Sequence, residues 1–292
     1  MRADVLRHSA IALSATIVAA LAAVVSAQGV QKSALVTVVA DNGTRTRDLT
    51  AKDFVVHEDK AERQVVGAEL ATEPLSVTIV VDTTQPPMGM PTATQDLRTA
   101  LSNFVKIVQA AAPDSQIAVM QCAGAATTVL DFTQKADELE KTVQHLFPNQ
   151  QSGAVLLEAL SEASRKLAEK PAPRRAIVTV DFNSREDSAS QQLKKVADDV
   201  RKSGATVWSV SVRGTNESAS TREAVLNAVT QASGGLRLTA VEPTGLDAML
   251  TKVANGLTSQ YTVTFARPDA SGMKPVKMEA RGAKVLLTPW LR

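Results

Sequence analysis

The sequence predicts a three-layer α/β fold: a mostly parallel sheet with helices on both faces, joined to a small β module from the N- and C-terminal segments. Three observations carry this prediction. Apolar strand patterns alternate with longer helical patterns between Leu75 and Leu257, short β-branched runs precede this region, and short β patterns return after it. Such alternation is typical of a parallel sheet whose crossover helices cover both faces.

The first 27 residues have the pattern of a secretory signal peptide. Arg2 and Arg7 precede an apolar run over about residues 9–25, and small residues follow up to Ala27. The run is short and rich in alanine, which favours cleavage after Ala27 over an uncleaved membrane anchor. We therefore expect an exported protein, periplasmic or extracellular, with no membrane span after cleavage.

Residues 28–72 are predicted to form the N-terminal β segment. A β-branched run at 35–40 leads into a turn signal, Asp-Asn-Gly, at 41–43. Two shorter runs follow at 54–57 and 64–70. The polar residues between these two runs predict a hairpin that pairs them.

Residues 73–258 are predicted to form the α/β domain. The runs at 77–81 and 176–180 are continuously apolar, as in strands that are buried on both faces. Further strands are expected at 117–122, 127–132, 206–212 and 236–238, with Gly124 in the turn between the first two of these. Helical spacing of apolar residues predicts helices at 97–108, 136–146, 154–167, 191–202, 222–232 and 246–257.

Residues 259–292 complete the chain with three short β patterns, at 261–265, 276–280 and 284–287. Neither terminal segment holds enough strands for a stable sheet of its own. We therefore expect the two segments to pack together into one module, which brings both ends of the chain close to each other.

Composition excludes several classes of protein. The chain has 292 residues, a net charge of +2, 44% hydrophobic and 3% aromatic residues, and one cysteine. These values argue against disorder, a nucleic-acid footprint and aromatic stacking platforms, and one cysteine rules out an internal disulfide framework or a cysteine-rich metal site. Cys122 ends an apolar run, so we expect a buried structural thiol.

Two acids stand directly after predicted parallel strands, where ligands bind in open sheets. They are Asp82 and Asp181, and hydroxyl groups follow the first at Thr83 and Thr84. Together these oxygens predict a site for a hard divalent cation such as Mg²⁺ or Mn²⁺. The alternative is that each aspartate caps the turn or helix that follows it.

Residues 75–84, Leu-Ser-Val-Thr-Ile-Val-Val-Asp-Thr-Thr, resemble the opening strand of a von Willebrand factor A (vWA) domain, and the order of strands and helices up to Leu257 matches that Rossmann-like family. The flanks at 41–59 and 260–265 resemble secreted vWA-related proteins of acidobacterial type. The resemblance therefore covers nearly all of the chain after the signal.

The resemblance implies a metal-ion-dependent adhesion site that is incomplete here. Asp82 matches the family's first Asp, Thr84 its first Ser and Asp181 its late Asp. Pro86 stands in place of the second Ser, and Ala154 in place of the later Thr, with Ser152 two positions away. The implied metal ligands are therefore Asp82, Thr84 and Asp181 alone, which predicts weak or absent binding of Mg²⁺ or Mn²⁺.

The loop after the first parallel strand is a candidate recognition loop. Residues 86–91, Pro-Pro-Met-Gly-Met-Pro, are stiff and partly apolar. Either they only connect two elements, or the adaptable methionines contact a partner. The predicted partner-binding residues are Thr83, Gln85, Met88 and Met90.

The leading functional hypothesis is an exported, non-enzymatic interaction or adhesion module that binds an unknown protein or cell-surface partner, and not nucleic acid. A metal-dependent ligand-binding vWA protein is the main alternative. A hydrolase resembling haloacid dehalogenases would use Asp82 as phosphoryl acceptor, but that chemistry needs a second acid where Thr84 stands. A small-ligand carrier is disfavoured because aromatic cleft residues are scarce.

Overall fold

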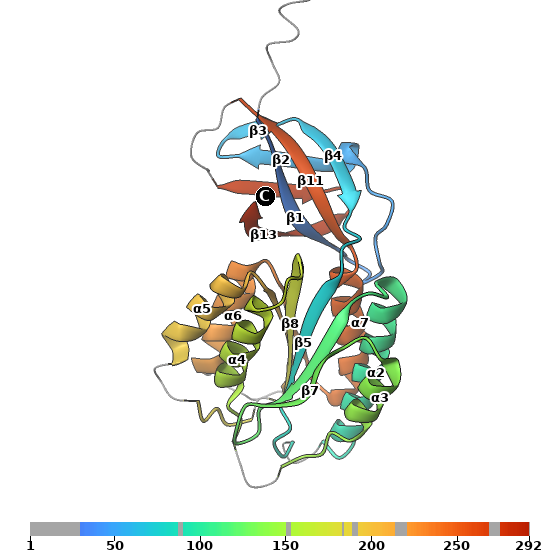
Figure 1. Cartoon of the computed structure of the whole chain (residues 1–292), viewed down its shortest axis with the longest axis vertical. Coiled ribbons are helices and arrows are strands. Elements are labelled where there is room, and N and C mark those ends of the chain that lie inside the picture. Colours follow the sequence, from blue (N-terminus) through green and yellow to red (C-terminus); the bar gives the residue numbers. More distant parts are fainter. Residues whose placement is uncertain are drawn as a thin grey trace, which may run out of the picture.

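A computed structural model describes residues 30–86, 90–149, 153–182, 184–188, 192–213, 221–268 and 275–291. In this part of the chain two sheets lie end to end (Figure 1). The predicted signal peptide falls outside the described residues. No helix among those described is long and apolar enough to cross a membrane.

The six-stranded sheet, sheet B, has the order β10-β9-β8-β5-β6-β7. All neighbours are parallel except β6 and β7. Gly124, with φ +71°, lies between that antiparallel pair, as predicted. The strands are β5 (Leu75–Val81), β6 (Gln116–Gln121), β7 (Thr127–Thr133), β8 (Arg174–Asp181), β9 (Thr206–Val212) and β10 (Arg237–Ala240). Every residue of β5 and β9 is buried, because helices cover both faces of the sheet.

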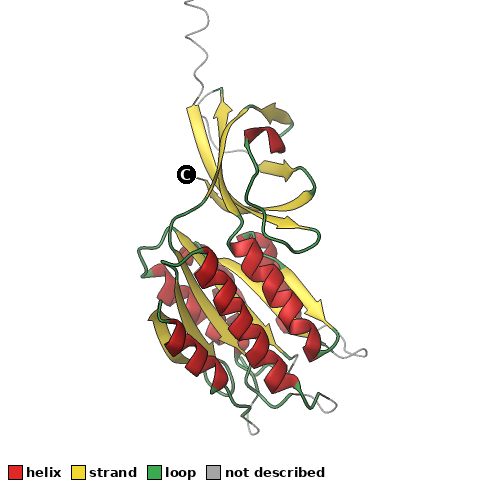
Figure 2. Cartoon of the chain, turned by 90° about the vertical axis from the view of Figure 1, so that its right-hand side faces the viewer, coloured by secondary structure: helices red, strands yellow, loops and turns green. Residues whose placement is uncertain are grey.

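Helices pack on both faces of sheet B (Figures 1 and 2). The first face carries α2 (Ala93–Ala111), α3 (Ala136–Gln144) and α7 (Leu246–Leu257), and the second carries α4 (Leu156–Ala168), α5 (Gln192–Ser203) and α6 (Thr221–Ser233). A short 3-10 turn, η2 (Pro243–Gly245), leads into α7. A separate apolar cluster fills the space under each helix layer, around Phe104 and Trp208 on the first face and around Leu160 on the second. The three-layer α/β prediction is confirmed.

The seven-stranded sheet, sheet A, joins both terminal segments in the order β3-β2-β12-β13-β1-β11-β4. Its strands are β1 (Val30–Ala40), β2 (Phe54–Glu58), β3 (Ala61–Arg63), β4 (Val65–Leu70), β11 (Gln260–Arg267), β12 (Val276–Ala280) and β13 (Ala283–Leu291), with the 3-10 turn η1 (Ala51–Asp53) before β2. The long β1 pairs with β11 and with β13, so strands from the two ends of the chain pair directly with each other. This confirms the predicted β module.

One predicted pairing in sheet A is wrong. The run at 54–57 does not pair with the run at 64–70; instead β2 pairs with the short β3, and β4 pairs with β11 at the other edge of the sheet. Spacing along the chain favoured a local hairpin. Local spacing carries no information about β11, which lies about 190 residues further along the chain and pairs with β4 in the fold.

Sheet A curls until its two ends meet. The carboxylate of Glu58, on β2, contacts Arg63 on β3 at 3.0 Å and Arg267 on β11 at 2.5 Å, although three strands separate β2 from β11 in the sheet order. Aliphatic and aromatic side chains fill the interior, and the rings of Phe54 and Tyr261 lie 5.7 Å apart between centroids. The result is a near-closed barrel above sheet B.

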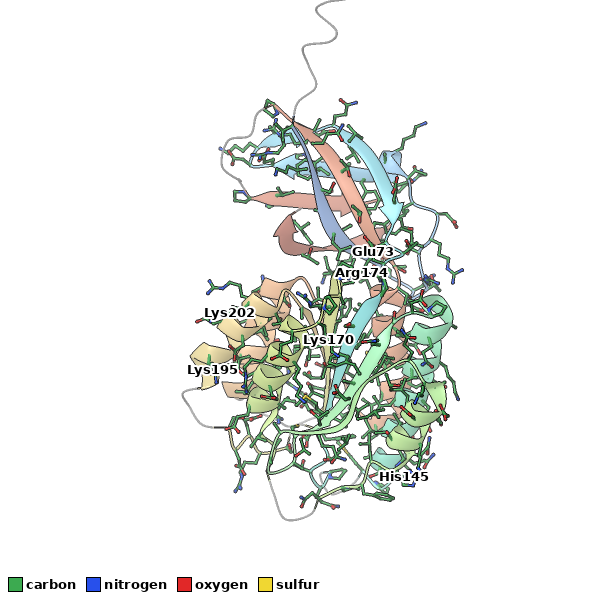
Figure 3. All side chains as sticks on the ribbon, in the orientation of Figure 1. Glu73, His145, Lys170, Arg174, Lys195 and Lys202 are labelled. Carbon is green, nitrogen blue, oxygen red and sulfur yellow. The ribbon has the colours of Figure 1, made fainter. Side chains whose placement is uncertain are left out.

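Two linkers connect the sheets, and Arg174 binds both of them. It is buried at the start of β8, between the sheets and close to Glu73 (Figure 3). Its guanidinium donates to the carbonyls of Ala71 and Glu73 in one linker and to Leu257 O and Gln260 Oε1 around the other, all at 2.8–2.9 Å. The carboxyl ends of the parallel strands lie at the opposite, free end of the molecule (Figure 1).

Candidate functional site

The two predicted acids lie next to each other at the carboxyl edge of sheet B. Neighbouring strands β5 and β8 are in register, with Val81 opposite Val180, and the backbone N–H of Asp82 donates to Val180 O at 2.8 Å. Asp82 and Asp181 therefore extend from adjacent strand ends. Both side chains are buried.

Hydroxyl groups satisfy both oxygens of Asp82. Oδ1 accepts hydrogen bonds from the backbone N–H and the hydroxyl of Thr84, at 2.9 and 2.7 Å. Oδ2 accepts a short bond, 2.5 Å, from the hydroxyl of Ser184. Ser184 was not among the residues predicted from the sequence. The one sequence feature that could have indicated Ser184 is its position, three residues after Asp181, which places its hydroxyl in the loop at the same sheet edge.

Asp181 is held by a hydroxyl and a buried cation. Oδ2 accepts from the Ser211 hydroxyl at 2.7 Å, and Oδ1 lies 3.3 Å from Nη2 of Arg222. The other terminal nitrogen of Arg222, Nη1, lies 3.6 Å from Oε2 of Glu186. Burial raises the pKa of Glu186, opposed by hydrogen bonds at Ser188 and by the Arg222 charge. Neither Glu186 nor Arg222 was among the site residues predicted from the sequence.

Cys122 lies inside this group of charges. It is fully buried just after β6, and its thiol donates to Val81 O at 3.5 Å. Burial raises the pKa of the thiol well above its usual range, and the carboxylates of Asp82, Glu186 and Asp181 raise it further, whereas Arg222 lowers it. The predicted buried thiol is confirmed.

As placed, these residues do not fit a divalent cation well. The Thr84 hydroxyl is turned to Asp82, and Asp181 is occupied by Ser211 and Arg222. Ala154, which the resemblance noted above places at the position of a threonine ligand, is buried. Within the described residues no group of three or more His, Cys, Asp or Glu side chains is arranged to hold a metal ion. Ser152 lies outside the described residues.

The predicted partner-binding residues differ in accessibility. Gln85 is exposed, whereas Thr83 is buried, and the Thr83 carbonyl accepts a hydrogen bond from Asn149 N at 2.6 Å. Met90 is partly buried against the core under α2. Met88 lies outside the described residues.

An aromatic residue that sequence analysis did not select lies at this rim. Phe147 has 62% of its surface exposed, the largest fraction among the large hydrophobic side chains that the structure describes. The Arg98 guanidinium lies 4.5 Å from the centre of its ring. Phe147 and Pro86 also line a cavity of about 10 Å³ that reaches Asp82. In the sequence, Phe147 directly precedes a proline, a position typical of an exposed loop. The low aromatic content of the whole chain drew attention away from this single residue.

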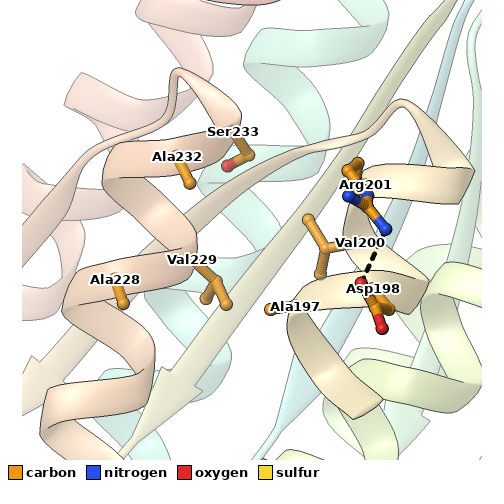
Figure 4. A pocket seen from close by; sticks show the side chains of 8 residues that line it. All are labelled: Ala197, Asp198, Val200, Arg201, Ala228, Val229, Ala232 and Ser233. Atoms are coloured by element: carbon orange, nitrogen blue, oxygen red, sulfur yellow. Dashed lines mark hydrogen bonds and ion pairs between the residues drawn. The ribbon is translucent and has the colours of Figure 1, made fainter. Parts of the chain in front are cut away.

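A larger hollow lies away from the strand-end acids. It measures about 350 Å³ and lies between the later turns of α5 and α6, lined by alanines, valines and the ion pair of Asp198 and Arg201 (Figure 4). These later turns face the amino ends of the strands. The hollow therefore shares no residue with the acids at the carboxyl edge.

Comparison with known proteins identifies the α/β region. The family model described as von Willebrand factor type A domain matches residues 76–246, which is more than half of the chain. No curated protein matches the chain.

Solved structures with a similar fold include proximal thread matrix protein 1 from the mussel byssus and the PilB minor pilin from Streptococcus sanguinis. The mussel protein is 13% identical with a TM-score of 0.53, over 64% of this chain and 48% of its own length. The pilin is 11% identical with a TM-score of 0.53, over 65% and 62%. A further structure of the mussel protein has a zinc-occupied metal-ion-dependent adhesion site, with 14% identity, a TM-score of 0.52 and coverage of 69% and 49%. At these identities the likeness shows the fold, and the chain spans about half of the mussel protein.

Proposed function

Because the chain belongs to the von Willebrand factor type A family, we propose that it is a non-enzymatic binding protein that recognises a protein partner with the carboxyl-end rim of sheet B. The observation that carries this proposal is Phe147. An exposed aromatic ring stacked with an arginine is the kind of group that dominates protein interfaces, because it removes a large rigid surface from water at small entropic cost.

The surroundings of Phe147 support recognition rather than catalysis. Asp82 is the acid that a phosphoryl-transferring enzyme would use, but it is buried and both its oxygens accept hydrogen bonds. A nucleophile needs an accessible lone pair directed at substrate. Pro86 and Phe147 line the same small cavity as Asp82, and with the exposed Gln85 they offer a surface for a partner.

We further propose that the protein acts outside the cytoplasm, as an adhesion or surface-binding module. The basic and apolar start of the sequence supports export. Proteins of similar fold include a minor pilin and a byssus thread protein, which agrees with such a role.

The test compares three versions of the chain from residue 28 onward: the natural sequence, Phe147→Ala and the control Val66→Ala. Val66 is also an exposed apolar residue, at 42%, but it lies on β4 in sheet A. Each protein is immobilised, exposed to extracellular and cell-surface extracts, and its captured proteins are quantified by mass spectrometry. The affinity of the main captured protein is then measured directly.

We expect Phe147→Ala to weaken that affinity at least about tenfold, and Val66→Ala to leave it unchanged. A partner whose affinity is lost with Val66→Ala and kept with Phe147→Ala would place the binding surface on sheet A, and would overturn the proposal.

A further inference from the structure

The acids at the carboxyl edge of sheet B are compensated by a cation that belongs to the chain itself. Arg222, near the start of α6, has only 1% of its side chain exposed and lies between Asp181 and Glu186, with nitrogen–oxygen distances of 3.3 and 3.6 Å. A guanidinium keeps its charge at all relevant pH values. Arg222 therefore places a permanent positive charge between two carboxylates inside the protein. Arg237, which donates to the Ser211 hydroxyl at 3.3 Å, adds a second positive charge near Asp181.

Glu186, the ion-pair partner of Arg222, lies close to the position of the incomplete metal site. The backbone of Glu186 forms a β-bridge with Ala154, the residue that stands where the family has a threonine. Its carboxylate accepts a hydrogen bond from Leu157 N, in the first turn of α4, at 3.5 Å. Glu186 and its partner Arg222 thus lie beside the point where a ligand hydroxyl is missing.

The third acid leaves little room for an ion. Both oxygens of Asp82 accept hydrogen bonds, and the cavity that touches it measures about 10 Å³. Such a volume holds about one water molecule. A magnesium ion keeps several water molecules in an octahedral shell about 2.1 Å from the metal, and this shell needs more space.

We infer that Arg222 replaces the divalent cation at this sheet edge, so that the site keeps its shape and charge balance without metal. This inference rests on the proposed function, because it states that recognition at the rim is independent of metal. Arg222 is buried and does not touch the partner. It positions the loop that carries Glu186, while exposed residues such as Phe147 make the contact.

The experiment uses the chain from residue 28 onward as the natural sequence, Arg222→Met, Arg222→Lys and Arg201→Met. Methionine keeps much of the apolar volume of arginine and removes the charge. Arg201 is the matched control because it makes an ion pair with Asp198 but is 68% exposed. Unfolding midpoints are measured with EDTA and with millimolar Mg²⁺, and Mn²⁺ binding is measured by calorimetric titration.

For the natural sequence we expect equal midpoints with EDTA and Mg²⁺ and no saturable Mn²⁺ binding below about 1 mM. Arg222→Met should lower the midpoint by about 8 °C or more, because two buried carboxylates lose the guanidinium that lies between them, whereas Arg201→Met should change it by less than about 2 °C. Arg222→Lys should fall between, because it keeps the charge and loses the forked geometry.

One-to-one Mn²⁺ binding by the natural sequence that disappears in Asp82→Asn would overturn the inference, as would an unchanged midpoint in Arg222→Met. The titration of the natural sequence decides the question even if Arg222→Met does not fold. If capture depends on Phe147 and also requires Mg²⁺, the inference fails and the proposed function stands. If capture does not depend on Phe147, the proposed function fails and the Mn²⁺ titration still tests Arg222.

Discussion

The buried thiol of Cys122 makes the free energy of unfolding depend on pH in the alkaline range. In the unfolded chain its pKa is near the ordinary value of 9.0, whereas burial in the folded protein raises the pKa well above that value. Above pH 9 the unfolded state therefore loses this proton first. The stability that depends on the protonated thiol is complete below pH 9 and is lost as the pH rises towards the folded-state pKa.

We predict that the free energy of unfolding falls by up to about 1.4 kcal/mol per pH unit above pH 9, and that Cys122→Ala removes this contribution to the slope. Urea unfolding of both proteins between neutral pH and about pH 10 measures it. The measurements stop at about pH 10 because burial also raises the pKa of Tyr261 from its ordinary value of 10.0. Above that pH, the ionisation of Tyr261 in the unfolded chain adds a second pH dependence to the free energy of unfolding. Equal slopes for both proteins below pH 10 would contradict the prediction.

Residues of the candidate site differ in how far the sequence could predict them. Asp82 and Asp181 follow continuous apolar runs, and parallel strands end at one edge, so their proximity was predictable. Arg222 was not, because it belongs to a helix 41 positions after Asp181 and arginines at helix starts are usually solvated. Its burial depends on how α6 packs against sheet B, which no local pattern specifies.

At the scale of elements, an ion triad closes sheet A. Glu58 on β2 contacts Arg267 on β11 and Arg63 on β3, and the hydrogen bond from Arg267 is the largest of the effects that lower the pKa of Glu58, ahead of Arg63 and against burial. The ionised form is therefore the one that stabilises the closed sheet. Its contribution is present above pH 4.5, the ordinary value, and is lost as the pH falls through the lower folded-state pKa.

We predict that Glu58→Gln lowers the free energy of unfolding by about 2 kcal/mol at neutral pH, because two arginines lose a shared carboxylate. The difference from the natural sequence should shrink when the pH falls below 4.5. Glu62→Gln is the control, since Glu62 is exposed on β3. Urea unfolding at neutral and acid pH measures both variants, and a difference that grows in acid would contradict the prediction.

The elements of sheet B were more predictable than the pairing within sheet A. Strands buried on both faces give unbroken apolar runs, as in β5 and β9, and the helices between them have a clear apolar spacing. In sheet A the strands β2, β3 and β4 are short and only partly buried, and the sequence of β4 shows no preference for one partner over another. Its place beside β11 depends on the fold of the whole chain.

At the scale of the whole molecule, the two sheets are joined by more than their linkers. Asn255 at the end of α7 donates to Gly43 O at 2.9 Å, and Arg45 donates to Thr258 O at 2.8 Å. At the end of α6 the backbone approaches β13 so closely that a Cβ on Gly234 would lie 2.3 Å from Leu287 O. Contacts this close hold the barrel and the α/β region in one arrangement.

Arg174 contributes to this coupling directly, because its one guanidinium binds both linkers. We predict that the natural sequence unfolds in one calorimetric transition, and that Arg174→Met separates it into two because the bonds between the linkers of the two sheets are lost.

The neighbouring Arg175 gives the matched control: it also donates to backbone carbonyls, at Ser203 and Lys170, but both belong to the α/β region. Arg175→Met should therefore lower the unfolding temperature and keep a single transition. If Arg174→Met still unfolds in one step, with equal calorimetric and van't Hoff enthalpies, the coupling between the sheets resides in the surrounding contacts and not in this side chain.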